Sequence, residues 1–254
     1  MFVPLHDENR LKSIRFQYVT VALIALNVLV YVFEQTDIGD AVLGSFALIP
    51  GELLGVGAPG GAISGGSASW LVPEPATLLS YMFFHGSIYH LAGNMLFLWV
   101  FGDNVEDAMG HVKFLAFYLA CGIFAGLTHT VIANSSLGSS LSELVPGSGD
   151  VPVSALNMPL IGASGAVAGV IAAYLMLHPR VRIWVLAFNA IPLRISAAIA
   201  LGAWIIMQIV MVVIPHSGPV AWWAHIGGLI AGAILVVFLR RRGVPLFDKV
   251  AVAG

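Results

Sequence analysis

The chain has 254 residues, of which 59% are hydrophobic and only 9% are charged. A soluble domain carries about 25% charged residues, so this composition excludes an ordinary soluble protein and indicates an integral membrane protein. The formal net charge is −2, and the useful information lies in where along the chain the charges fall.

Six apolar segments qualify as candidate membrane spans, since a span takes about 20 mostly apolar residues. They lie at about residues 16–33, 78–101, 113–133, 160–177, 195–214 and 220–239. A long outer loop, residues 34–77, separates the first two. Its first part is apolar enough to lie against the membrane surface, and we expect its glycine-rich part to be flexible. We therefore predict an all-α polytopic membrane protein, with residues 1–254 forming a single membrane domain.

The basic residues all fall on one side of the membrane in this arrangement. All 11 Lys and Arg lie before the first span, between the second and third, between the fourth and fifth, or after the sixth. The loops on the other side contain acidic residues and no basic ones. Because Lys and Arg are enriched in cytoplasmic loops, we expect both termini in the cytoplasm. The second, fourth and sixth spans then all run inward from the outer face.

A serine and a histidine lie near the outer ends of the fourth and sixth spans. They are Ser164 and His225, each within an otherwise apolar run. Ionisable residues inside spans are costly, so by default they mark functional sites. A hydroxyl nucleophile activated by a histidine base is the minimum that a serine hydrolase needs. We expect Ser164 as the nucleophile and His225 as the general base, in a dyad rather than a triad, because no carboxylate lies inside the six spans.

A pair of glycines follows each of these two residues. Gly165 and Gly169 follow the serine by one and five residues, and Gly228 and Gly232 follow the histidine by three and seven residues. Small residues four apart let two helix backbones approach closely in lipid. We therefore expect the fourth and sixth spans to approach closely enough for a Ser–His hydrogen bond of about 2.6–3.2 Å. Helix packing without catalysis is the alternative explanation for these glycines.

Three more polar residues lie near the outer end of the second span. His90 and Asn94 are four residues apart and share a helix face. Ser164 lies near the N-terminus of its helix, where unpaired N–H groups favour an oxyanion. We expect the Ser164 backbone, His90 and Asn94 to stabilise the oxyanion of the reaction. His85 would point elsewhere on a regular helix, so we expect it to brace the junction between loop and helix.

Three short motifs combine on these spans: His85-x₄-His90-x₃-Asn94, Gly162-Ala-Ser-Gly165, and Ala224-His225 followed by Gly228 and Gly232. Together they resemble the motifs of the rhomboid intramembrane serine proteases. The likeness covers nearly the whole chain and includes residues 101–107, which are similar to a stretch of bacterial rhomboids. The resemblance implies a six-span helical bundle and a Ser164–His225 dyad. It also implies oxyanion support from the Ser164 backbone, His90 and Asn94.

The same resemblance implies an endopeptidase that cleaves transmembrane segments of other proteins near the outer face. The expected partners are these transmembrane substrates and the lipid bilayer, with no nucleic acid. No cofactor and no metal are expected. The resemblance points to the bacterial plasma membrane, with the active site toward the outer face. Nothing in the sequence indicates an oligomeric state.

Two positions depart from the family pattern. Ala76 and Thr77 stand where rhomboids often have a Trp-Arg pair, which questions how the outer loop is anchored. Ala168 stands where an aromatic residue is common, four positions after the serine. This second departure removes a candidate stacking partner for His225.

Other functions are open alternatives to the protease. A non-catalytic relative could bind transmembrane helices for membrane quality control, but the presence of both Ser164 and His225 argues against it. A metal site at His85 and His90 is disfavoured, because five-residue spacing does not place two ligands on one helix face. The segment Gly147-Ser-Gly-Asp150 matches a motif of intramembrane aspartyl proteases, yet no second aspartate lies inside a span.

Overall fold

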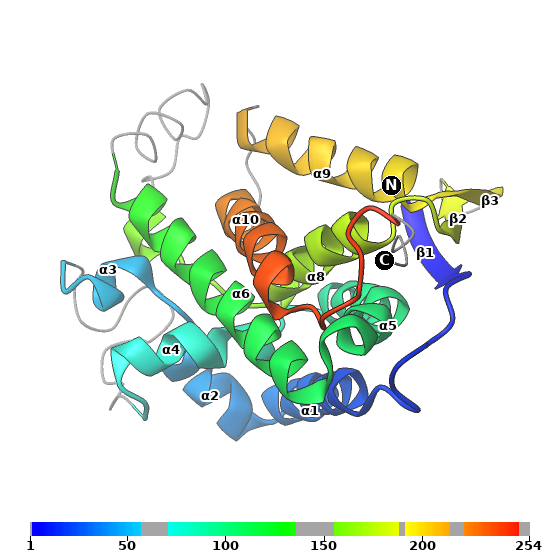
Figure 1. Cartoon of the computed structure of the whole chain (residues 1–254). Coiled ribbons are helices and arrows are strands. Elements are labelled where there is room, and N and C mark those ends of the chain that lie inside the picture. Colours follow the sequence, from blue (N-terminus) through cyan, green and yellow to red (C-terminus); the bar gives the residue numbers. More distant parts are fainter. Residues whose placement is uncertain (1, 57–70, 136–154, 188–190, 214–220, 249–254) are drawn as a thin grey trace.

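The structure, a computed structural model, describes residues 2–56, 71–135, 155–187, 191–213 and 221–248 (Figure 1). Asp150 and most of the glycine-rich part of the outer loop lie outside these ranges. The elements in chain order are β1 (Phe2–Asp7), α1 (Tyr18–Glu34), α2 (Asp37–Phe46), α3 (Pro50–Leu53), α4 (Glu74–Ser80), η1 (Tyr81–Phe83), α5 (Ile88–Met109), α6 (His111–Ala133), η2 (Ala155–Asn157), α8 (Ser164–Leu177), β2 (Arg182–Ala187), β3 (Ile191–Ser196), α9 (Ala197–Val213) and α10 (Trp222–Leu239).

Helices form at all six predicted spans, as α1, α5, α6, α8, α9 and α10. Among the described residues, α6 and α10 are long and apolar enough to cross a membrane by themselves. Helices α1 and α2, bent by 118° at their junction, form a third candidate if they count as one span. The chain is therefore a mostly helical bundle with two or three candidate spans. The expected count of six spans stays a prediction.

The predicted second span, residues 78–101, is not one helix. The chain leaves the helical conformation at Phe84, and α5 begins only at Ile88. Ser87 caps α5, because its hydroxyl accepts a hydrogen bond from the His90 backbone N–H at 3.2 Å. The helix then continues to Met109, well past the predicted end. Helix α5 thus begins and ends later than the apolar segment, because Ser87 caps its start and the helix continues into the charged stretch. The bounds of the membrane span itself stay a prediction.

The C-terminal part of α5 holds the N-terminal segment of the chain. The Glu106 carboxylate accepts hydrogen bonds from the backbone N–H groups of Val19 (3.0 Å) and Thr20 (2.8 Å). These N–H groups belong to the first turn of α1, which has no side-chain cap of its own. Glu106 thus satisfies N–H groups that a helix start would otherwise leave unpaired. This contact gives a structural reason for the charged stretch at residues 101–107.

A three-stranded antiparallel sheet, in the order β1-β2-β3, corrects the all-α prediction. Figure 1 shows it beside one end of α9. Ile183 and Val185 alternate along β2 and are buried. This period of two is the signature of a strand with one buried face. The span prediction had left these residues in a loop.

Helix α8 lies near the centre of the bundle and contacts α5, α6, α9 and α10 (Figure 1). A Cβ atom on Gly228 would collide with the backbone carbonyl of Gly165, and one on Gly232 would collide with the carbonyl of Gly169. The two glycine pairs therefore face each other across α8 and α10. The predicted close approach of the fourth and sixth segments is confirmed at the level of the backbone.

Candidate active site

The candidate active site joins the start of α8 to the first turn of α10. Ser164 is the first residue of α8, and His225 lies one turn into α10. The Oγ atom of Ser164 lies 2.8 Å from Nε2 of His225. His225 is only 8% exposed, whereas Ser164 is partly exposed. A nucleophile that can be reached thus contacts a base that is shielded.

Gln208 on α9 sets the orientation of His225. The Oε1 atom of Gln208 lies 2.7 Å from Nδ1 of His225, and Gln208 is 1% exposed. The amide nitrogen of Gln208 donates to the carbonyl of Trp204 at 3.4 Å, which assigns the amide oxygen to the side of His225. Because an amide oxygen only accepts, Nδ1 carries the imidazole proton. Nε2 is then free to accept the proton of the Ser164 hydroxyl, as a general base must.

Two tryptophans surround the His225 ring. The Trp204 ring centroid lies 6.2 Å from that of His225, and the Trp222 ring meets it edge-on at 5.8 Å. Ala168, at the position where an aromatic residue is common, packs in a small cluster with Trp204 at its border. The aromatic neighbours of His225 therefore come from α9 and α10 rather than from α8.

His85 lies in the segment before α5 and turns into the site. Its Nδ1 lies 3.3 Å from the Phe83 carbonyl, so Nδ1 donates and Nε2 is left as an acceptor. Nε2 accepts from the Asn94 amide nitrogen at 3.1 Å and faces the backbone N–H of Ala163 at 3.4 Å. The helix is not regular here, because His85 lies between η1 and the start of α5 at Ile88. The condition under which His85 would point away from His90 therefore does not apply, and its bracing role stays a prediction.

The His90 ring lies against the backbone of Gly162, two residues before Ser164. Gly162 has a φ of +120°, a conformation that side-chain-bearing residues rarely adopt. A Cβ atom there would also lie 2.5 Å from Cε1 of His90. The His90 ring in turn lies 5.1 Å from the His85 ring. The structure thus gathers His85, His90 and Asn94 beside residues 162–163, next to Ser164.

The outer loop is tied to this cluster by hydrogen bonds. The Glu34 carboxylate at the end of α1 accepts from the His85 backbone N–H at 2.8 Å. Leu48 and Leu160 exchange backbone hydrogen bonds of 3.0 and 2.8 Å, which links the loop to the chain just before Ser164. These contacts anchor the described part of the loop without the Trp-Arg pair that residues 76–77 lack.

A family model described as the Rhomboid domain matches residues 72–242, more than half of the chain. The chain belongs to the rhomboid family. Its matched region contains Ser164, His225, Gln208 and the cluster at residues 85–94.

Curated relatives of this rhomboid include three mitochondrial proteins. RHOMBOID-like protein 12, mitochondrial, of Arabidopsis thaliana is 27% identical over 165 residues, which cover 65% of this chain and 46% of the relative. The human presenilin-associated rhomboid-like protein, mitochondrial, is 29% identical over 63% of this chain and 37% of its own length. Rhomboid protein 1, mitochondrial, of Saccharomyces cerevisiae is 26% identical over 67% and 43%. The chain thus spans less than half the length of these relatives.

The predicted location of this rhomboid is corrected by these relatives. A bacterial plasma membrane was expected, but the relatives are mitochondrial proteins. The expectation rested on residues 101–107, which the structure explains through contacts with the N-terminal segment. The placement of Lys and Arg predicts which loops lie on the same side of a membrane, and it does not identify which membrane that is.

Gln208 is the site residue that sequence reasoning missed in this rhomboid. An amide inside an apolar span is a costly polar group, so its position in the fifth predicted span was an available signal. The sequence-based prediction considered only carboxylates as a third catalytic group and therefore passed over this amide.

Among the residues that the structure describes, no three His, Cys, Asp or Glu side chains gather in a way that could hold a metal ion.

Proposed function

We propose that this rhomboid is a serine endopeptidase that cleaves transmembrane segments of other membrane proteins within the bilayer. The observation that carries the proposal is the 2.8 Å contact between Ser164 Oγ and His225 Nε2. The hydrogen bond from His225 Nδ1 to Gln208 supports it, since it leaves Nε2 as the acceptor. Family membership alone would not separate a protease from a relative that only binds helices.

In the proposed reaction, Ser164 Oγ attacks the carbonyl carbon of the scissile peptide bond while its proton passes to His225 Nε2. The tetrahedral oxyanion forms beside the N-terminus of α8, where the Ser164 N–H, His90 and Asn94 are the proposed donors. The His225 imidazolium then protonates the leaving amine, and an acyl-enzyme remains on Ser164. Water activated by His225 hydrolyses the ester and restores the serine. Gln208 holds the His225 ring throughout.

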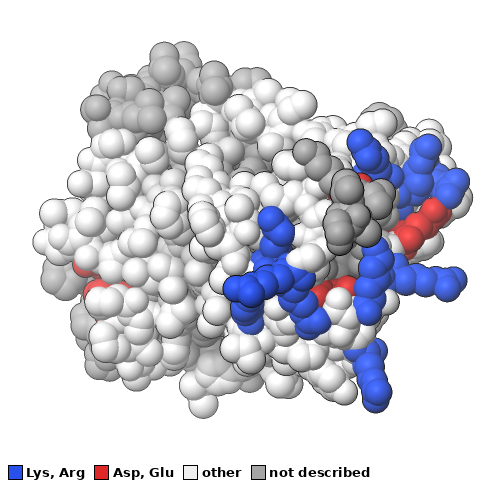
Figure 2. Space-filling model, viewed as in Figure 1, with Lys and Arg blue, Asp and Glu red and all other residues white. Residues whose placement is uncertain are grey.

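We further propose that the described helices cross the membrane six times within one domain spanning residues 1–254, with both termini on the same face. Figure 2 shows Lys and Arg side chains gathered at one end of the molecule. We call this end the basic face. Helix α8 starts at Ser164 and ends at Leu177, three residues before Arg180, so we place the catalytic pair at the end of the helix away from this arginine. Because the relatives are mitochondrial proteins, we propose that this rhomboid lies in a mitochondrial membrane.

The test is cleavage of a transmembrane reporter by the full chain, compared with the Ser164→Ala variant. Ser196→Ala, a serine at the end of β3 that lies outside the catalytic pair and its neighbours, is the matched control. We expect cleavage by the wild type and by Ser196→Ala, and its loss in Ser164→Ala. Cleavage by Ser164→Ala at the wild-type rate would overturn the assignment of the nucleophile. A wild-type chain that captures the reporter without cutting it would favour the helix-binding alternative.

A further inference from the structure

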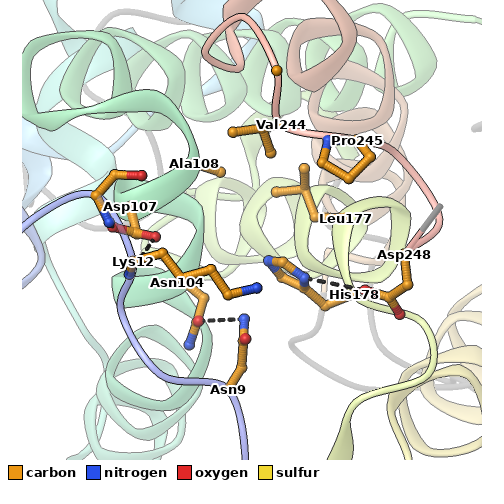
Figure 3. Close-up of a pocket in the computed structure, with 12 residues that line it drawn as sticks. Asn9, Lys12, Asn104, Asp107, Ala108, Leu177, His178, Val244, Pro245 and Asp248 are labelled. Atoms are coloured by element: carbon orange, nitrogen blue, oxygen red, sulfur yellow. Dashed lines mark hydrogen bonds and ion pairs between the residues drawn. The ribbon is translucent and has the colours of Figure 1, made fainter. Parts of the chain in front are cut away.

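A cavity of about 350 Å³ opens on the basic face, far from the catalytic pair. It lies between the N-terminal segment, the ends of α5 and α8, and the segment that follows α10 (Figure 3). Ser164 and His178 lie at opposite ends of α8, roughly 20 Å apart at 1.5 Å of rise per residue. The cavity therefore takes no part in the proposed reaction. Its lining combines apolar residues with the polar or charged side chains of Lys12, Asp107, His178 and Asp248.

Lys12 is the one Lys or Arg among the described residues that line this cavity. Figure 3 shows its ammonium end directed toward the His178 ring, and its charge acts on that ring. Within the described ranges, Arg194 is the only Lys or Arg with a carboxylate oxygen within 4 Å, so Lys12 has no such partner. Lys12 is an exposed residue, and an ammonium group without a counterion can bind an anion.

The two carboxylates of the cavity, Asp107 and Asp248, differ in how many short hydrogen bonds they accept. Asp107 accepts hydrogen bonds from the backbone N–H groups of residues 12–14 at 2.7–3.0 Å, which use both of its oxygens and three of about four acceptor positions. Asp248 accepts from the Arg180 N–H at 2.8 Å, and its contact with His178 is long, at 3.4 Å. The Asp248 side chain is also 24% exposed. A carboxylate offers about four acceptor positions, so Asp248 can bind a further donor.

The cavity therefore presents one unpaired cation and one carboxylate with spare acceptor positions. Figure 3 shows Lys12 and Asp248 on either side of the His178 ring. This arrangement complements a small zwitterion whose phosphate and ammonium are joined by a short carbon linker. A purely anionic ligand would leave Asp248 facing a like charge, and a lone cation would leave Lys12 unpaired.

We propose that this cavity binds the phosphoethanolamine headgroup of a phospholipid, with the phosphate on Lys12 and the ammonium on Asp248. Pockets between helix ends of membrane proteins lie at headgroup depth, where lipid phosphates meet basic side chains. The apolar walls at Ala108, Leu177 and Val244 suit the carbon linker and the glycerol. A choline headgroup lacks the N–H donors that Asp248 would accept.

The experiment measures lipid retention by native mass spectrometry of the full chain, released from neutral detergent supplied with phosphatidylethanolamine, phosphatidylcholine or phosphatidylglycerol. We expect one phosphatidylethanolamine per chain, retained at about tenfold lower concentration than the other two lipids, as one charged hydrogen bond would give. Lys12→Met should remove this retention, because it removes the ammonium that binds the phosphate. The variant should keep its fold, because Lys12 bonds to Asp107 through its backbone N–H. Lys113→Met, which removes an exposed lysine outside the cavity, is the matched control and should retain the lipid.

Asp248→Asn tests the ammonium contact separately. The variant keeps an oxygen for the Arg180 N–H and should lose the preference for ethanolamine over choline while still binding phosphate. Soluble phosphoethanolamine should compete with the lipid better than inorganic phosphate does, which distinguishes a headgroup site from a phosphate site without any variant. Equal retention of the three lipids, or equal loss in Lys12→Met and Lys113→Met, would overturn the proposal. Ser164→Ala should bind lipid like the wild type, so failure of the protease proposal would leave this one standing.

Discussion

Replacing Gln208 by leucine removes the only acceptor that the structure describes for His225 Nδ1–H, at 2.7 Å. Leucine is similar in size and apolar, so the variant should keep the packing of α9 while the proton on Nδ1 loses its partner. The imidazolium that forms during the reaction then has one donor unsatisfied in a site that is almost closed to water. Since this charge exists in the transition state and not in the free enzyme, the cost should fall on the rate.

The expected loss follows from the value of a hydrogen bond to a charged group, about 1.5–3 kcal/mol. At 1.36 kcal/mol for each factor of ten, this corresponds to a fall in kcat of roughly 10- to 150-fold with little change in KM. The assay is cleavage of a transmembrane substrate, together with the rate at which a fluorophosphonate probe labels Ser164. Probe labelling reports activation of the nucleophile and does not depend on substrate binding.

Two comparisons separate orientation of His225 from a general loss of structure. Gln208→Glu keeps an acceptor for Nδ1 and should label faster than Gln208→Leu. Gln35→Leu makes the same change at an exposed position outside the site and should behave like the wild type. If Gln208→Leu is labelled within twofold of the wild type, then Gln208 does not set the orientation of His225.

Three further predictions concern the oxyanion donors, the helix contact and the sheet. Asn94→Ala should lower kcat by about 10²–10³, as measured by reporter cleavage, if Asn94 is an oxyanion donor. Gly228→Ala should destabilise the protein by about 1–3 kcal/mol in a thermal or denaturant melt, because the new Cβ meets a backbone carbonyl of α8, whereas Gly202→Ala meets nothing within 4 Å and should be neutral. The hydrogen bonds from Arg194 lower the pKa of the exposed Glu8, so the pair stabilises the fold above the ordinary pKa of Glu and the effect is lost as the pH falls through the lowered value. The melting temperatures of the wild type and Glu8→Gln should therefore differ at pH 7 and converge as the pH falls below the lowered pKa of Glu8.

The contact between α8 and α10 could be predicted from the sequence because small residues four apart permit close backbone approach. The facing glycines Gly165 and Gly228 are an example: the pattern predicted that their helices would touch, and the backbones do touch. Charge placement then predicted a common depth for Ser164 and His225, which stays a prediction. Both inferences use one-dimensional patterns that follow directly from membrane physics.

The features that the sequence did not predict depend on tertiary contacts or on local capping. Gln208 is a single amide in an apolar helix, and only the fold shows that its oxygen meets the His225 ring. His85 enters the site because Ser87 starts a new helix and leaves the preceding residues extended. The sheet forms because β1, far away in the chain, pairs with β2. Such long-range pairings have no signature within a window of one span.

The central claim is that Ser164 is a nucleophile activated by His225. Mass-spectrometric mapping of the fluorophosphonate adduct on the purified full chain tests it most directly. The adduct should lie on Ser164 in the wild type and be lost in His225→Ala, while His6→Ala, a histidine outside the site, should leave it unchanged. An adduct on another serine, or labelling of Ser164 that survives His225→Ala at the wild-type rate, would contradict the claim.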